Sequence, residues 1–238
     1  MTDYATMSNV FLVPSWFLGY DIIFEIAFAI VTFMVALFSF KVYKLTHQSK
    51  PYIFGMGFML MCAGYVIQAI LNSIFFFYIR HMSFSPSQAN FIITIYMIAV
   101  YAYTYLMLLG LITLVYMSFS IKKPKVHLLM SLLVLMVLIS AMDKLLLFYL
   151  MSAVISFFIL HHYLYNYIKN KRKTSLLVML GFASMLIAYI FFIFSLDSAL
   201  FYFIGHAFKL IAYTLILINL FHIIRKDKSN LLKTMLGR

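Results

Sequence analysis

The chain contains seven apolar stretches, and the segments between them hold most of its charges. Crossing the hydrocarbon core of a bilayer, about 30 Å thick, takes roughly 20 apolar residues of helix. Membrane spans are expected near residues 20-42, 52-79, 88-120, 125-142, 145-168, 174-196 and 199-224. The sequence therefore predicts an all-α integral membrane protein, a seven-transmembrane-helix bundle. Residues 1-225 would form a single membrane domain and residues 226-238 a short basic tail.

The fourth and fifth stretches are the hardest pair to separate. Only Met142, Asp143 and Lys144 lie between them. The 44 residues from 125 to 168 are nevertheless too many for a single crossing of the bilayer. We therefore expect a tight hairpin at this point, with one helix on each side of it.

Charged residues make up only 10% of the chain, whereas soluble domains are about 25% charged. Fifteen of the 18 Lys and Arg residues follow the first, third, fifth and seventh stretches. They are Lys41, Lys44, Lys50, Lys122, Lys123, Lys125, Lys169, Lys171, Arg172, Lys173, Arg225, Lys226, Lys228, Lys233 and Arg238. Because basic loops stay in the cytoplasm, the N-terminus is predicted outside and the C-terminus inside.

This topology explains the net charge of +12 without a nucleic-acid partner. Basic loops attract the anionic headgroups of the cytoplasmic leaflet. The tail at 226-238 is expected to lie on the membrane surface or to dock a partner. We predict a multi-pass protein of the cell membrane. Its expected partners are the lipid bilayer and a cytoplasmic or membrane protein, and nucleic acid is not among them.

Lys209 is unusual because it lies inside the last apolar stretch. At about 1.5 Å of rise per residue, Lys209 lies about 15 Å and His206 about 10 Å below the outer start of that stretch. Glu25 lies about 8 Å below the start of the first stretch, at an overlapping level. A charge at the bilayer centre costs about 2.5 to 3.5 kcal/mol, so Lys209 should face the bundle interior and have a partner. Glu25 is the acidic residue predicted to be that partner.

Other polar residues fall at the same depth. Gln68 and Asn72 are one helical turn apart on the second stretch and share one face. On the last stretch, Lys209 shares a face with His206 and Tyr213. The predicted ligand-binding residues are Glu25, Gln68, Asn72, Tyr96, His206, Lys209 and Tyr213.

Two interpretations compete with a ligand or ion site at this layer. In the first, the polar residues form a structural network that only determines which helices pair. In the second, Glu25 lies at the membrane interface with Asp21 and is solvated there. A ligand site is favoured because ionisable residues inside a membrane are usually functional.

The sequence requires no cofactor and gives little support for a known one. The identity of any cofactor is unknown. A lysine in the last of seven helices suggests a retinal Schiff base. However, residues 88-120 contain no Asp or Glu and the position four before Lys209 is Gly205, so the counterions of microbial rhodopsins are missing. A haem between two histidines near the inner boundary is the other alternative. Its candidate ligands, which more often reach toward headgroups, are His161, His162 and His222.

The sequence contains no HExxH, GxSxG or glycine-rich phosphate motif, so we do not expect an enzyme. The single cysteine, Cys62, excludes an intrachain disulfide and a thiolate metal cluster. We predict a non-enzymatic sensor or receptor-like protein. It would bind a small ligand, lipid or proton at the polar layer and signal to a cytoplasmic partner. The alternatives are a transporter or channel that uses this layer as a relay, and a structural subunit of a membrane complex.

Two segments resemble known membrane proteins. "GHAFKLIAYTLILINL", residues 205-220, resembles the last helix of the MASE3-type multi-helix membrane sensor domains that precede histidine kinases and cyclases. "PSWFLGYDIIFEIAFAIVTFMVALFSFKVYKL", residues 14-45, resembles the first span of stand-alone archaeal seven-helix proteins. The resemblance implies a seven-helix input bundle with His206 and Lys209 in its sensing half. No kinase, PAS or cyclase domain follows, so a signal would have to pass to a separate partner.

Overall fold

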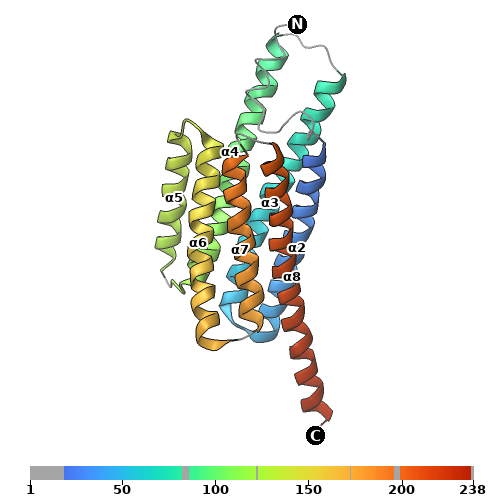
Figure 1. Cartoon of the computed structure of the whole chain (residues 1–238), viewed down its shortest axis with the longest axis vertical. Helices are drawn as coiled ribbons and strands as arrows, with labels where there is room; N and C mark the ends of the chain where they lie inside the picture. Colours follow the sequence, from blue (N-terminus) through green and yellow to red (C-terminus); the bar gives the residue numbers. More distant parts are fainter. Residues whose placement is uncertain (1–18, 82–85, 122, 172, 196–198, 237–238) are drawn as a thin grey trace.

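The computed structural model describes residues 19–81, 86–121, 123–171, 173–195 and 199–236. The only regular elements in these residues are seven α-helices (Figure 1). They are α2 (Tyr20–Thr46), α3 (Ser49–His81), α4 (Pro86–Ser118), α5 (Pro124–Ser140), α6 (Lys144–Asn170), α7 (Lys173–Phe194) and α8 (Ala199–Leu236). Six of them are long and apolar enough to cross a membrane. The predicted all-α membrane bundle is therefore confirmed.

The α5 helix is the element that fits the predicted crossings least well. Its 17 residues extend about 25 Å at 1.5 Å per residue, which is less than the hydrocarbon core. The hairpin is present as expected, because α5 ends at Ser140 and α6 begins at Lys144. A seventh crossing by α5 stays a prediction.

Six of the helices form a closed ring in the part of the chain that the structure describes. In order around the ring, α2 packs on α3, α3 on α4, α4 on α6, α6 on α7, α7 on α8, and α8 back on α2. The first and last helices of this bundle are therefore neighbours. The α5 helix lies outside the ring, packs on α4 and touches α6, at the left edge of Figure 1.

Glycines allow the closest approaches within the ring. Gly57 of α3 and Gly110 of α4 face each other, and a Cβ on Gly110 would lie 2.7 Å from the Gly57 carbonyl oxygen. Small residues at such crossings let membrane helices pack backbone to backbone. On the other side, a Cβ on Gly205 would lie 2.8 Å from the Phe192 ring, so this glycine seats α8 against α7.

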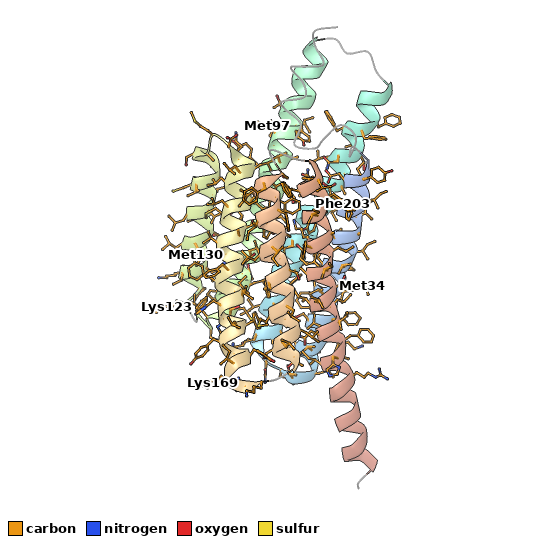
Figure 2. The ribbon with its side chains drawn as sticks, in the orientation of Figure 1. Met34, Met97, Lys123, Met130, Lys169 and Phe203 are labelled. Atoms are coloured by element: carbon orange, nitrogen blue, oxygen red, sulfur yellow. The ribbon has the colours of Figure 1, made fainter. Side chains whose placement is uncertain are left out.

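The outer surface of the bundle is apolar. Side chains such as Met34, Ile98 and Phe157 point away from the ring and are exposed, as lipid-facing residues of a membrane bundle would be. In Figure 2, Lys123 and Lys169 lie toward one end of the bundle and Phe203 toward the other. We call these the predicted inner end and the predicted outer end.

The last helix does not stop at the predicted boundary of the membrane domain. α8 continues without interruption from Ala199 to Leu236, and its final turns project beyond the bundle in Figure 1. Most of the predicted tail at 226-238 is thus a helical extension of the last span. Residues 237 and 238 lie outside the described part of the chain.

Candidate functional site

Two carboxylates at the start of α2 point into the ring. Asp21 and Glu25 are one helical turn apart, and their residues are only 3% and 5% exposed. The Asn72 side chain of α3 binds both, because its Nδ2 donates to Glu25 Oε1 at 2.7 Å and to Asp21 Oδ2 at 3.3 Å. The Gln68 amide in turn donates to Asn72 Oδ1 at 3.4 Å. An amide pair on α3 therefore holds the two acidic groups together.

Asp21 also connects α2 to the last helix. The Tyr202 hydroxyl donates a hydrogen bond to Asp21 Oδ1 at 2.9 Å. The Nε2 atom of His206, one turn further along α8, lies 3.5 Å from the same oxygen. The contact between the first and last helices of the ring thus includes a polar link at this level.

Lys209 is 2% exposed and lies inside a cage of aromatic rings. Its Nζ atom is 5.7 Å from the Phe28 ring centroid, 5.1 Å from Tyr65, 5.2 Å from Tyr189 and 5.3 Å from Phe192. These distances are within the range of cation–π attraction. Three different helices besides α8 supply the rings.

The predicted pairing of Lys209 with Glu25 is an attraction across a gap rather than a contact. No carboxylate among the described residues makes a direct ion pair with the Lys209 ammonium. Glu25 and then Asp21 are nevertheless the acidic groups that act on it electrostatically. The cage thus surrounds the ammonium with ring faces and leaves the carboxylates beside it.

A narrow cavity of about 30 Å³ lies between these groups, and all six helices of the ring line it. This volume accommodates about one or two water molecules. Glu25, Gln68, His206 and Lys209 from the predicted set line it, together with Asp21 and Tyr149. Glu25 Oε2 and Gln68 Oε1 are buried without a hydrogen-bond partner among the described residues. Buried oxygens of this kind favour a water-sized guest that can donate to them.

The remaining predicted residues lie beside the cavity and do not line it. Asn72 acts on it through its hydrogen bonds with the two carboxylates and with Gln68. Tyr96 packs on the Phe75 ring, with centroids 5.5 Å apart. Tyr213 lies one turn below Lys209, and its hydroxyl and that of Tyr65 are 2.7 Å apart. These residues form the walls around the site.

Sequence reasoning missed Asp21 as a member of the site. The alternative in which Asp21 and Glu25 are solvated at the interface is wrong, since both residues are buried. The spacing of four between Asp21 and Glu25, and between Tyr202 and His206, places each pair on one helix face and was the available signal. The aromatic cage had no comparable signal, because 19% of the chain is aromatic.

The candidate haem ligands do not converge. His162 Nε2 is 2.8 Å from Asn166 Nδ2 on its own helix, and the His162 ring packs on Phe119. His161 and His222 point to the exposed surface, and α7 lies between their helices. In the described residues no group of three His, Cys, Asp or Glu side chains is arranged to hold a metal ion.

Comparisons with known proteins give no relative from which a role can be transferred. No family model matches the chain, and no curated protein or solved structure matches it. A function therefore has to be argued from the chemistry of the site itself.

Proposed function

We propose that this chain is a non-enzymatic membrane sensor whose cavity binds a proton or another water-sized ligand. Two carboxylates face one ammonium across the cavity, so the cluster has one negative charge in excess when all three are ionised and His206 is neutral. An uncompensated negative charge inside a membrane is costly, and it favours taking up a proton or a small cation. The cavity volume of about 30 Å³ excludes larger guests in this conformation.

The observation that carries this proposal is the separation of Lys209 from its counterions. The ammonium rests on four rings and contacts no described carboxylate, while Glu25 Oε2 has no described hydrogen-bond partner. A purely structural ion pair would be expected to close this gap, because direct contact gives the largest electrostatic gain. An open arrangement leaves the carboxylate ready to accept a ligand.

The helix contacts suggest how binding would be transmitted. Asp21 joins α2 to α8 through Tyr202 and His206, so a change in the charge of this carboxylate alters the contact that closes the ring. α8 then extends to Leu236 beyond the predicted inner end. Binding would favour one of two packings of α8, and the extension would present that packing to a partner or to lipid. The resemblance of residues 205-220 to the last helix of MASE3-type sensor domains also favours a sensor, and a relation to those domains is part of this proposal.

The test is a pH jump on the purified protein in lipid nanodiscs, followed by infrared difference spectroscopy and by the distance between two spin labels. The labels replace the exposed residues Tyr52 of α3 and Ile218 of α8 in a Cys62→Ala background. We expect a carboxyl band and a change in label distance, both lost in Glu25→Gln. Asp143→Asn removes an exposed carboxylate outside the cavity and should change neither.

An unchanged band and an unchanged distance in both Glu25→Gln and Asp21→Asn would reject the proposal. The groups facing these carboxylates, His206, Lys209 and Tyr202, are retained in both variants. The loss of a response would therefore be assigned to the carboxylates.

A relay for proton transport is the second candidate, and a row of hydroxyl groups favours it. Among the described residues, many serine and threonine hydroxyls donate to a carbonyl in the preceding turn of their own helix, as Thr104 does to Val100. Ser152 and Ser156 are fully buried on one face of α6, and the Ser156 hydroxyl has no described partner. The Tyr189 hydroxyl, on one of the cage rings, lies beside the Ser152 hydroxyl. These groups extend the polar surface from Lys209 toward the predicted inner end.

Proteoliposomes with an internal pH dye separate the two candidates. A relay predicts proton flux that falls at least tenfold in Ser152→Ala and Ser156→Ala, while the pH-induced change in label distance persists. A sensor predicts no flux above that of empty liposomes. Ser140→Ala, which removes an exposed hydroxyl bonded to its own helix, is the matched control.

A further inference from the structure

A second cavity lies at the predicted inner end of the ring. Its volume is about 270 Å³, close to the lower limit of about 300 Å³ for small-molecule pockets. It opens between the end of α2, the first turns of α3 and α7, and the inner part of α8. The polar residues that matter for its chemistry are Gln48, Lys50, Thr174, Ser175 and Asn219. None of the residues that line it is acidic.

Asn219 provides the first indication of a ligand. This residue of α8 is 4% exposed and lines the cavity. Its Oδ1 atom has no hydrogen-bond partner among the described residues. A buried amide without a partner is unfavourable and is usually satisfied by something else at the site. A guest with a hydroxyl group would supply the missing donor.

The opposite wall provides an independent indication, because it combines an ammonium with two helix N-termini. Thr174 and Ser175 lie in the first turn of α7, and Lys50 lies in the first turn of α3. The first turns of both helices contain no acidic residue. The unsatisfied N–H groups and the positive end of the dipole at a helix N-terminus favour an anion. Two such ends and one ammonium surround the mouth of the cavity.

We propose that this cavity binds a phosphate ester that carries a free hydroxyl group, the chemistry of a phosphoglycerol headgroup. The phosphate lies between Lys50 and the first turn of α7, and the hydroxyl donates to Asn219 Oδ1. Val42, Leu220 and Ile223 form an apolar wall beside it that suits a glycerol backbone. The same chemistry is offered by an anionic phospholipid or by a soluble phosphate ester, and this site does not depend on the proposed function of the outer cavity.

Native mass spectrometry of delipidated protein in detergent tests the lipid source. Phosphatidylglycerol and phosphatidylcholine are added at equal concentration. We expect retention of phosphatidylglycerol at least tenfold above that of phosphatidylcholine. Lys50→Gln removes the ammonium from the phosphate and Asn219→Leu removes the acceptor of the hydroxyl, so each should reduce this retention about tenfold. Lys44→Gln removes an exposed lysine of α2 that does not line the cavity and should have no effect.

Asn219→Leu keeps the approximate size of the side chain, and its fold is checked by its thermal melting curve. Phosphorus NMR with glycerol phosphate forms the second arm. Binding of glycerol phosphate that is lost in Lys50→Gln, without selective lipid retention, supports the same site with a soluble ligand. If neither ligand binds, or if both variants bind as the wild type does, the proposal is overturned.

Discussion

The two cavities of the ring differ in the charges of the residues that line them. The outer cavity, of about 30 Å³, is lined by two carboxylates, a histidine and a lysine, so the protein itself supplies charges of both signs. The inner cavity is about 270 Å³, contains no acidic lining residue and combines Lys50 with an amide that lacks a described partner. A cluster that supplies its own counterions responds to small changes of charge. A cavity with charge of one sign needs a counterion from outside. The comparison predicts that replacing a buried amide by an apolar residue will lower the free energy of unfolding at the outer cavity. At the inner cavity the same replacement should leave this free energy constant or raise it.

The largest effect is expected for Lys209→Met, which removes the ammonium of the outer cluster while keeping a side chain that fills the cage. Asp21 and Glu25 are then buried without a counterion, and the free energy of unfolding should fall by about 3 kcal/mol. Unfolding in mixed micelles measures this change. Lys144→Met is the control, because Lys144 lies over a single ring, that of Tyr101, at 4.9 Å.

A loss no larger than that of Lys144→Met would contradict the idea of a charge-coupled cluster. A second variant sharpens the result. Adding Asp21→Asn to Lys209→Met removes one of the two uncompensated charges and should restore part of the lost stability. Such a gain in the double variant is the sign of coupling between the two groups.

The next largest effect is expected for Asn72→Leu. The Asn72 amide donates to Glu25 at 2.7 Å and, through a long bond of 3.3 Å, to Asp21. A hydrogen bond to a charged group is worth about 1.5 to 3 kcal/mol, and the short bond to Glu25 dominates here. We expect a loss of about 2 kcal/mol in the free energy of unfolding. Ser73→Ala, at the adjacent position, removes a hydroxyl that bonds only to its own helix and should cost less than about 0.5 kcal/mol. Equal losses in the two variants would show that Asn72 does not hold the carboxylates.

A smaller effect is expected for Gly205→Ala. The added Cβ would lie 2.8 Å from the Phe192 ring, which is 5.3 Å from Lys209 Nζ. Because a ring cannot yield as a flexible chain does, we expect a loss of about 1 to 2 kcal/mol and a weaker infrared response. In Gly181→Ala the added Cβ meets the Ile216 side chain at 2.9 Å and the Ala212 carbonyl oxygen at 3.2 Å, so this variant is the control for a tight helix contact that does not involve Phe192. A stronger infrared defect in Gly181→Ala than in Gly205→Ala would break the link between Phe192 and the outer cavity.

These contrasts also show why the sequence predicted one cavity and not the other. The membrane bundle and the depth of Glu25, His206 and Lys209 follow from hydropathy and helical rise, which are properties of single stretches. The inner cavity combines residues 39 to 54 with 174, 175 and 219, which come together only when the ring closes. Asn219 is an ordinary polar residue near a helix end in the sequence, and nothing in its neighbours indicates a buried amide.

The arrangement of the helices in a ring could not be predicted from the sequence either. Seven apolar stretches do not reveal that α5 is left outside or that α4 packs on α6. This arrangement depends on close contacts such as that of Gly57 with Gly110, whose partners are 53 positions apart and share no local pattern. The aromatic cage of Lys209 has the same origin, since its rings come from three other helices.

The smallest effect, and the most informative sign, is expected for Asn219→Leu. In lipid-free detergent, this variant replaces a buried amide that lacks a described partner with an apolar group of similar size. The free energy of unfolding should stay constant or rise by up to about 1 kcal/mol, because the cost of an unsatisfied group is removed. The same variant should lose the stabilisation that added phosphatidylglycerol gives the wild type, since ligands stabilise only the state that binds them.

Asn72→Leu should behave in the opposite way, with lower intrinsic stability and an unchanged response to lipid. If Asn219→Leu instead destabilises the lipid-free protein as much as Asn72→Leu does, its amide has an internal structural partner. The buried amides at both ends of the ring would then be structural, and the argument for a ligand in the inner cavity would fail.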